Sequence, residues 1–254
     1  MPPPPKPPKA GPLGSLLAAA GLIVGLGLAL AQEGEPVALE LVLALDSSSS
    51  VSAEEFDLQR RGIALAFRDP AVRKAIADLG EPGLAVAVLQ WSGGRMQRLA
   101  VEWTRITGAA GGQDIDRLAA AVASSARLLT GGTSLGGAVR TALAEIEANR
   151  FEGRRKVIDV SGDGFTGLSP RRERDRAVER GVTINGLAIL NEKPELGLYY
   201  AAHLIGGPGA FVLTAGSYED FAEAMRDKLL QEISGFTVAK ALINPMRRPG
   251  RRIR

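Results

Sequence analysis

Oxygen-bearing side chains gather in three short segments of the sequence. These segments are DSSSS at 46–50, TGGTS at 130–134 and SGDGFTG at 161–167. Carboxylates and hydroxyls suit a hard divalent cation, because Mg²⁺ prefers octahedral oxygen coordination and takes few carboxylates from protein while keeping several waters. The candidate ligands are Asp46, Ser48, Ser50, Thr133 and Asp163. We expect them to hold Mg²⁺ or Mn²⁺, with Ca²⁺ the less favoured ion.

The spacing within these segments favours a shared site. Asp46, Ser48 and Ser50 alternate along the chain, so in an extended or looping segment their side chains can converge on one side. Glycines let the backbone turn tightly near an ion, and they stand at 131, 132, 162 and 164. Two carboxylates do no more than neutralise a divalent ion, and if one of them acts through water the local field stays positive. We therefore expect such an ion to recruit an acidic group from another molecule.

Each segment also has an ordinary structural explanation. Ser50 or Ser52 can cap the helix that follows, and Thr133 or Ser134 can cap the next one. Asp163 can serve a glycine turn. The metal interpretation is favoured because all three segments occur together at the ends of predicted strands.

Strand-like and helix-like segments alternate along the chain, which is typical of a mostly parallel sheet covered by helices on both faces. The predicted strands are 37–45, 156–162, 182–190 and 210–214, with a hairpin at 84–105. The predicted helices are 53–68, 114–128, 135–149, 170–180 and 218–233. Capping-box patterns at Ser52 and Glu55 and at Ser217 and Asp220 mark the starts of the first and last helices.

In such α/β sheets, binding sites lie at the carboxyl ends of the strands, where loops meet helix starts. The segment at 46–50 follows the strand 37–45, and the segment at 161–167 follows the strand 156–162. The segment at 130–134 directly precedes a predicted helix. We expect the five candidate ligands to meet at this end of the sheet, with partner choice set by the rim at 165–172 and 191–200.

The D-x-S-x-S spacing in DSSSS, the threonine in a Gly-rich loop and SGDG after a strand together resemble the von Willebrand factor A (vWA) domain and its metal-ion-dependent adhesion site. The resemblance covers residues 37–234. It implies a Rossmann-like three-layer sandwich with a mostly parallel central sheet and one antiparallel edge strand. It also implies that the five candidate ligands bind Mg²⁺ or Mn²⁺, directly or through water, and that a partner's carboxylate completes the coordination shell.

Two further stretches, RRKVIDVSGDG and HLIGGPGAFV, look closest to a family of exported bacterial vWA-like proteins whose function is unassigned. One departure from the vWA pattern concerns the third motif, which is usually a short DG at the strand end. Here DVSGDG offers both Asp159 and Asp163. Asp163 is the better candidate, because Asp159 falls inside the strand pattern.

A hydrolase is the alternative interpretation. GTSLG at 132–136 fits G-x-S-x-G, and Ser134, Asp163 and His203 occur in the order Ser, Asp, His. A nucleophile elbow needs a strand directly before the serine, whereas IDRLAAAVASSARLL is alanine-rich with helical periodicity. His203 is better explained as a structural residue on a helix. Since no Walker loop or cofactor fingerprint appears either, we expect a binding domain rather than an enzyme.

The ends of the chain differ from its body. Residues 1–31 have Lys6 and Lys9, then an apolar run, then small residues before Gln32. This is typical of a signal peptide and predicts an exported protein, periplasmic or secreted. The run is also long enough for a membrane anchor if it stays uncleaved. No cysteine is present, which excludes disulfides and thiolate metal sites.

One domain at 36–235 is the simplest organisation between these ends. The segment 236–254 is a basic tail ending in RRPGRRIR. Its arginines, with Lys6 and Lys9, account for the whole excess of 31 basic over 28 acidic residues. No aromatic residues interleave with the tail, so a nucleic-acid partner is not expected.

Overall fold

The computed structural model describes residues 1–3, 34–108, 111–165, 168–191 and 193–235. The predicted signal peptide at 1–31 lies outside these residues except for its first three, and so does the whole basic tail at 236–254. Within the predicted rim, Thr166, Gly167 and Glu192 also lie outside them. No helix among the described residues has the length and apolarity needed to cross a membrane.

A six-stranded sheet forms the centre of the fold, with strand order β3-β2-β1-β4-β5-β6. Its strands are β1 Glu35–Asp46, β2 Leu84–Trp91, β3 Gln97–Ile106, β4 Phe151–Gly162, β5 Val182–Ile189 and β6 Val212–Ala215. Every neighbouring pair is parallel except β2 and β3, which form an antiparallel hairpin at one edge. This confirms the predicted mostly parallel sheet with one antiparallel edge strand.

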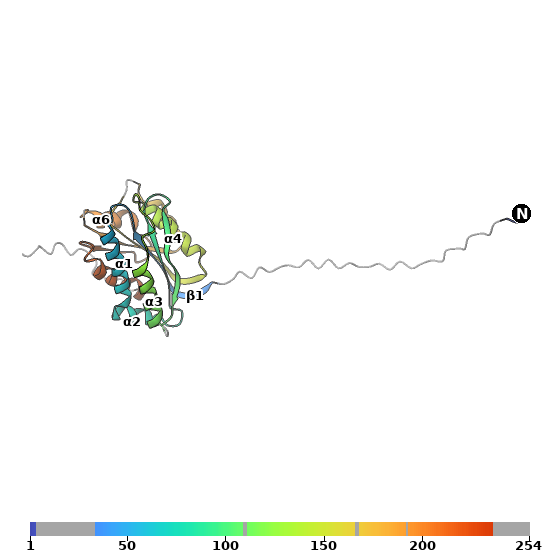
Figure 1. The fold of residues 1–254 in the computed structure, drawn as a ribbon, viewed down its shortest axis with the longest axis horizontal. Helices are drawn as coiled ribbons and strands as arrows, with labels where there is room; N and C mark the ends of the chain where they lie inside the picture. The colour runs from blue at the N-terminus through green and yellow to red at the C-terminus, as the bar shows by residue number, and fades with distance from the viewer. Residues whose placement is uncertain (4–33, 109–110, 166–167, 192, 236–254) are drawn as a thin grey trace, which may run out of the picture. The chain divides into compact units, whose positions relative to one another are not determined.

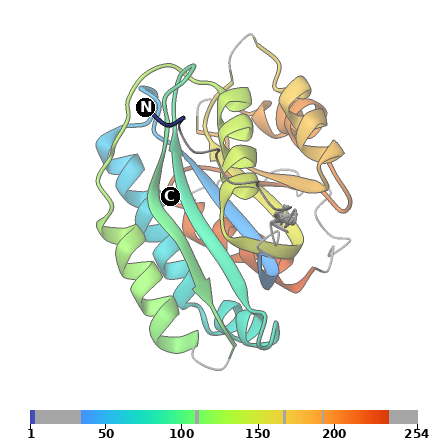
Figure 2. The same ribbon diagram turned by 90° about the vertical axis from the view of Figure 1, so that its right-hand side faces the viewer.

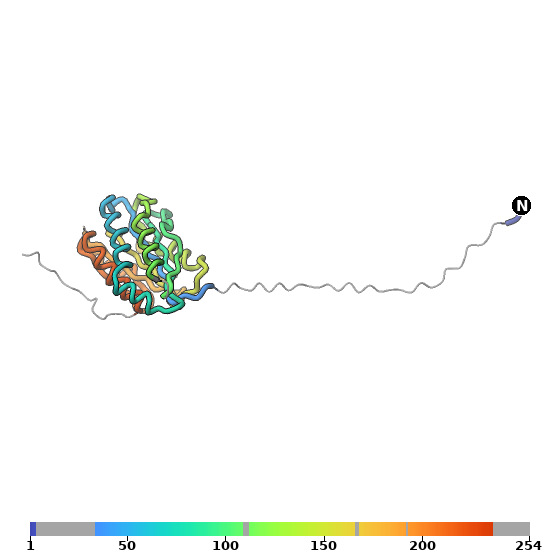
Figure 3. Tube along the Cα trace, turned by 60° about the horizontal axis from the view of Figure 1, so that its bottom comes forward, coloured from blue at the N-terminus to red at the C-terminus, as the bar shows by residue number. Residues whose placement is uncertain are grey.

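Helices cover both faces of the sheet, as the sequence predicts (Figures 1 and 2). They are α1 Ala53–Arg68, α2 Pro70–Ala77, α3 Gly111–Ser124, α4 Leu135–Ala148, α5 Arg171–Glu179, α6 Leu196–Tyr199, a π-helical turn η1 Tyr200–Leu204, and α7 Phe221–Ser234. On one face α1 packs against both α3 and α7, which Figure 3 shows side by side. On the other face α4 packs against α5, and η1 packs against α5 and α6.

The central strand β1 is apolar almost throughout because it is buried on both sides. Leu41, Leu43 and Leu45 join the core under α1, α3 and α7. Val42 and Ala44 point the other way and join the core under α4. This alternation delivers the last residue of the strand, Asp46, to the carboxyl edge on the α4 side of the sheet.

The structure contains one of the two predicted capping boxes. The capping box at Ser52 is confirmed: the Glu55 N–H donates to Ser52 Oγ (3.2 Å) and the Ser52 N–H to the Glu55 carboxylate (2.7 Å). The second predicted box is wrong, because α7 begins at Phe221 and its N-cap Asp220 makes no side-chain capping bond. Helix α2 was not predicted, although Asp69 caps it and Pro70 opens it.

The helix predicted at 114–128 ends at Ser124. Ser125 Oγ bonds back to the Val122 carbonyl (2.8 Å), a side-chain bond that competes with helix continuation. Gln90 on β2 then accepts from the Leu128 N–H (2.7 Å) and donates to the Ala126 carbonyl (2.8 Å). These bonds hold residues 126–128 alongside the sheet instead of in the helix.

Candidate functional site

Asp46 is fully buried at the end of β1. Its Oδ1 accepts a hydrogen bond from the Ser48 N–H (2.7 Å), and its carbonyl accepts one from Gln59 Nε2 of α1 (3.1 Å). Its Oδ2 has no hydrogen-bond partner among the described residues. A buried carboxylate oxygen without a donor is costly, so this atom marks a position where a cation would be favourable.

A chain of hydrogen bonds joins this end of β1 to the end of β4. Ser48 Oγ lies 3.0 Å from Ser50 Oγ, and Ser50 Oγ donates to Asp163 Oδ1 over 3.0 Å. Asp163 follows β4 directly and is only 8% exposed. The structure therefore brings four of the five predicted ligands, Asp46, Ser48, Ser50 and Asp163, into one connected group.

Thr133 lies in the loop before α4, at the same end of the sheet. A Cβ built on Gly164 would lie 3.7 Å from Thr133 Oγ1, which places this hydroxyl beside the residue that follows Asp163. No hydrogen bond of Thr133 occurs within the described part of the chain. Its hydroxyl is thus near the connected group without being joined to it.

Gly162 provides the space that the Asp46 carboxylate occupies. A Cβ at this position would lie 2.7 Å from Asp46 Oδ2, 2.9 Å from Trp91 Cζ2 and 3.1 Å from the Tyr200 hydroxyl. The first two contacts are shorter than side chains tolerate, and the third is tight. A glycine is required here because the carboxylate, the indole and the phenol meet over its backbone.

Backbone contacts fix the first loop from outside. Arg127 donates through Nη2 to the carbonyls of Ser47 (3.0 Å) and Ser48 (2.7 Å). The Ser49 N–H donates to the Gly131 carbonyl (2.7 Å), and Gly131 has a φ of 153°, which favours glycine. A hydrogen bond within the protein therefore holds the loop at 46–50 to the loop at 130–134.

The electrostatics of the site favour added positive charge. Burial raises the pKa of Asp46 to about 7 against the hydrogen bonds from Ser48, and the charge of Asp163 adds to the increase. Burial, with the nearby Asp46 and Asp163, also raises the pKa of Tyr200, whose hydroxyl has no hydrogen-bond partner among the described residues. A nearby cation would stabilise the charged form of Asp46 and lower its pKa.

The donor set fits a hard cation and not a soft one. The described residues contain no group of three or more His, Cys, Asp or Glu side chains that could hold a metal. Binding would rest on two carboxylates, three hydroxyls and water, which is the chemistry of Mg²⁺ and Mn²⁺. Asp159 lies away from this group, since its Oδ2 is 2.8 Å from Lys228 Nζ of α7. The geometry therefore favours Asp163 over Asp159 as the candidate ligand.

A family model described as "Protein of unknown function (DUF1194)" matches residues 36–237. The chain belongs to the DUF1194 family. No curated protein matches its sequence.

Solved structures show the same fold as this DUF1194 chain. Proximal thread matrix protein 1 from the mussel byssus, with a zinc-occupied MIDAS motif, matches with a TM-score of 0.52 at 14% identity, over 80% of this chain and 49% of the mussel chain. Von Willebrand factor type A from Catenulispora acidiphila matches with a TM-score of 0.53 at 17% identity, over 78% and 43% of the two chains.

The pilus adhesin SpaC from Lactobacillus rhamnosus GG matches with a TM-score of 0.55 at 13% identity, over 81% of this chain and 31% of the adhesin. The DUF1194 chain thus spans half or less of the length of these proteins. At these identities the likeness shows the fold, and it confirms the predicted vWA-like architecture.

The DUF1194 chain does not assemble the alternative Ser, Asp, His triad among its described residues. Ser134 Oγ caps α4 by accepting from the Gly137 N–H (3.2 Å). His203 lies on η1, 3.3 Å from Ser169 Oγ and stacked on Tyr199. Asp163 accepts from Ser50. Each member has another partner, and no described hydrogen bond joins any two of the three.

Three residues around the site were not predicted from the sequence: Gln59, Arg127 and Tyr218. Lys193 and Tyr200 fall within the rim predicted at 191–200, but no role of their own was predicted for them. Arg127 was assigned to a helix, so its role appears only once α3 ends early. Tyr200 and Tyr218 read as ordinary core aromatics, and burial of their hydroxyls near two carboxylates is a tertiary feature. No local pattern in the sequence signals these positions.

Proposed function

We propose that this DUF1194 chain is an exported, divalent-cation-dependent protein-binding domain of the adhesion or scaffold type. The observation that carries the proposal is the Asp46 carboxylate, buried with one oxygen lacking a donor and connected through Ser48 and Ser50 to Asp163. A structural turn would satisfy its buried acceptors from within the protein. A cation site leaves such an oxygen for the ion.

The residues of the chain have separate roles in this proposal. Asp46 and Asp163 supply the charge, and Ser48, Ser50 and Thr133 supply neutral oxygens. Arg127 and Gln59 hold the backbone of the first loop. When bound, Mg²⁺ or Mn²⁺ would offer an open coordination position to a carboxylate of the protein partner. Among the similar structures, one is a pilus adhesin and one has a zinc-occupied MIDAS motif, which supports this interpretation.

The test is a calorimetric titration of the full chain with Mn²⁺ and with Mg²⁺. The parent is expected to bind, and Asp46→Ala is expected to lose more than about tenfold in affinity. Asp78→Ala is the matched control, because Asp78 is an exposed carboxylate directly after α2, paired with Lys74. Circular dichroism verifies that both variants fold. Equal affinity of Asp46→Ala and the parent contradicts the site.

The esterase alternative is tested with the same preparations. If the chain hydrolyses a chromogenic ester, Ser134→Ala and His203→Ala should each abolish turnover. If the parent shows no turnover, this alternative is removed. The binding function is better supported, because Ser134, Asp163 and His203 bond to other residues.

A further inference from the structure

A lysine and three aromatic rings form a column beside the candidate metal site. Phe165 stacks on Tyr199, with ring centres 4.3 Å apart and planes 15° apart. Tyr199 stacks in turn on His203 at 4.5 Å and 21°. Lys193 Nζ lies 5.5 Å from the centre of the Phe165 ring. We name these four residues, Lys193, Phe165, Tyr199 and His203, the aromatic column.

The aromatic column begins at the candidate metal site. A Cβ built on Gly164 would lie 3.4 Å from Lys193 Nζ and 3.7 Å from Thr133 Oγ1. The ammonium group and the candidate ligand hydroxyl therefore lie around the same backbone position. From there the stacked rings extend along α6 and η1, which carry Tyr199 and His203.

The surroundings of the aromatic column are apolar and exposed. Leu168 is 85% exposed and Leu198 is 76% exposed, the highest values of any large apolar side chain in the described body of the chain, residues 34–235. Both lie next to the column in sequence. Each leucine therefore adds exposed apolar surface close in sequence to a ring of the column, Leu168 three residues after Phe165 and Leu198 directly before Tyr199.

The aromatic column is also held in place and carries positive charge. His203 contacts Ser169, and Arg171 donates to the Ala202 carbonyl (3.3 Å), which fixes η1 to the start of α5. Lys193 makes no ion pair with any residue that the structure describes. A carboxylate that approaches the candidate metal site would therefore meet an ammonium group and then a rigid aromatic surface.

We propose that the aromatic column is the specificity half of the binding site and that it selects a partner segment in which an aromatic residue follows an acidic one. The acidic side chain is held at the candidate metal site and by Lys193. The aromatic side chain packs on the column and on Leu198. This inference rests on the proposed function and adds to it the chemistry of the partner.

The test uses the full chain saturated with Mn²⁺ and three capped dipeptides as probes: acetyl-Asp-Phe-amide, acetyl-Asp-Ala-amide and acetyl-Asn-Phe-amide. Calorimetry is expected to rank Asp-Phe first, about five- to tenfold tighter than Asp-Ala, because aromatic packing contributes about 1 kcal/mol beyond area. Asn-Phe is expected to bind weakest, because it lacks the carboxylate. Removal of Mn²⁺ with a chelator should weaken both Asp probes.

Two variants localise the effect: Leu198→Ser changes an exposed side chain, and Phe165→Ala removes a partly buried ring that packs against the core. Leu198→Ser and Phe165→Ala should remove the preference for Asp-Phe over Asp-Ala, while their Mn²⁺ affinity stays that of the parent. Leu65→Ser is the matched control, because Leu65 is a 60% exposed leucine on α1 and should change nothing. Lys193→Ala should weaken both Asp probes severalfold, and Lys193→Arg should restore them.

The outcomes separate this inference from the proposed function. Mn²⁺-dependent binding of Asp-Ala with no advantage for Asp-Phe overturns the inference and leaves the proposed function standing. An Asp-Phe advantage that persists in both Leu198→Ser and Phe165→Ala also overturns it. Absence of Mn²⁺ binding in the parent overturns both. A Mn²⁺-dependent dimer that Leu198→Ser dissociates would assign the surface to a second copy of the chain and likewise overturn the inference.

Discussion

Gly162 shows how much the candidate site depends on a missing side chain. Its backbone lies under the carboxylate of Asp46, the indole of Trp91 and the hydroxyl of Tyr200. The two neighbouring glycines of SGDG have different surroundings, because a Cβ on Gly164 would make only ordinary van der Waals contacts, the shortest being 3.4 Å. The same residue type is therefore indispensable at one position and replaceable two residues later.

We predict that Gly162→Ala destabilises the fold by about 1–3 kcal/mol, because overpacking displaces Asp46 or its neighbours. Mn²⁺ affinity should fall with it, since the displaced carboxylate is the central candidate ligand. Gly164→Ala is the matched control and should stay close to the parent in stability. Urea unfolding in the presence of a chelator measures both variants. Identical unfolding midpoints for the two variants would show that the space over Gly162 is not needed.

Among single residues, the spacing and the strand ends predict which side chains lie together. Four of the five candidate ligands, Asp46, Ser48, Ser50 and Asp163, form one hydrogen-bonded group, and their role as metal ligands stays a prediction. The residues that hold these side chains in place cannot be predicted in the same way. Arg127 donates to the first loop from 79 residues away in the sequence. Tyr200 belongs to the core on the α4 side of the sheet, and its hydroxyl lies over Gly162 with the Asp46 carboxylate. Such contacts depend on how the layers pack, which no local pattern contains.

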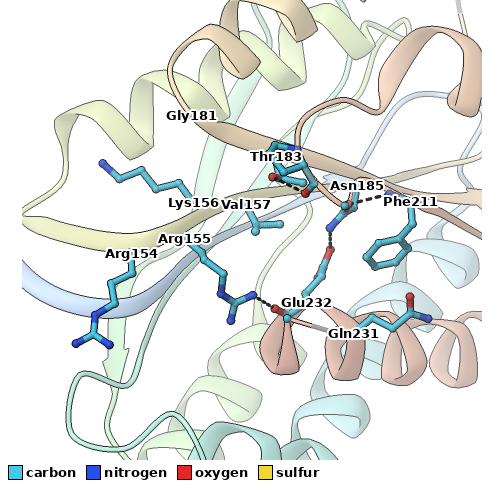
Figure 4. A pocket seen from close by; sticks show the side chains of 13 residues that line it. Arg154, Arg155, Lys156, Val157, Gly181, Thr183, Asn185, Phe211, Gln231 and Glu232 are labelled. Carbon is cyan, nitrogen blue, oxygen red and sulfur yellow. Dashed lines mark hydrogen bonds between the residues drawn. The ribbon is translucent and has the colours of Figure 1, made fainter. Parts of the chain in front are cut away.

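At the level of elements, α7 is fixed to the sheet by a buried charged group. Lys228 Nζ lies 2.8 Å from Asp159 Oδ2 of β4 and 2.5 Å from Glu232 Oε1. Glu232 Oε1 also accepts from Asn185 Nδ2 of β5 (2.8 Å), and Arg155 of β4 donates to the carbonyls at the end of α7. Figure 4 shows the contacts of Arg155, Asn185 and Glu232 beside a cavity of about 280 Å³.

This charged group titrates, because two buried carboxylates share one buried ammonium group. Burial, followed by the charge of Glu232, raises the pKa of Asp159 to about 7 from the ordinary value of 3.8, while Lys228 lowers it. The folded state then holds a proton that the unfolded chain releases above pH 3.8. The contribution of this proton to the free energy of unfolding is present in full below pH 3.8 and is lost as the pH rises through 7.

We predict that Asp159→Asn removes this pH dependence. As the pH rises from 4 to 8, the stability of the parent should fall relative to that of the variant, because the folded parent loses the proton that its buried Asp159 carboxyl holds at low pH. Urea unfolding at several pH values measures the difference. Asp227→Asn is the control, because Asp227 is a half-exposed residue on α7 paired with Arg226. Parallel stability curves for the parent and Asp159→Asn would contradict the assignment.

The sequence predicts most elements whose pattern is local, although α2 was missed despite its cap Asp69 and its first residue Pro70. Other features were missed because a partner element decides them. The strands β1, β4 and β5 and the helices α1 and α4 lie close to their predicted positions. The early end of α3 depends on Gln90 of a distant strand. In α7, the buried Lys228 and Glu232 read as surface residues by type, because only the tertiary structure reveals their partners.

For the whole molecule, the N-terminal segment predicts the route out of the cell. Residues 1–31 read as a signal peptide that ends before Gln32. We predict that the mature chain begins at Gln32, which mass spectrometry of the N-terminal peptide from the exported fraction determines. Ala31→Arg should block cleavage and retain the full-length chain at the membrane, whereas Gln32→Asn should not. An intact N-terminus on the membrane-bound parent would favour the anchor.

The central place of β1 has a mechanical consequence. The strand starts at Glu35 and ends at Asp46, and it pairs in parallel with β2 on one side and β4 on the other. If a bound partner pulls at Asp46 while the chain is held before residue 35, the load runs along the strand axis. Both hydrogen-bond ladders are then loaded in shear together, and no edge strand can peel away first. Forced unfolding is a rate process, so a tether with this geometry would sustain a pull longer than one anchored at β3 or β6.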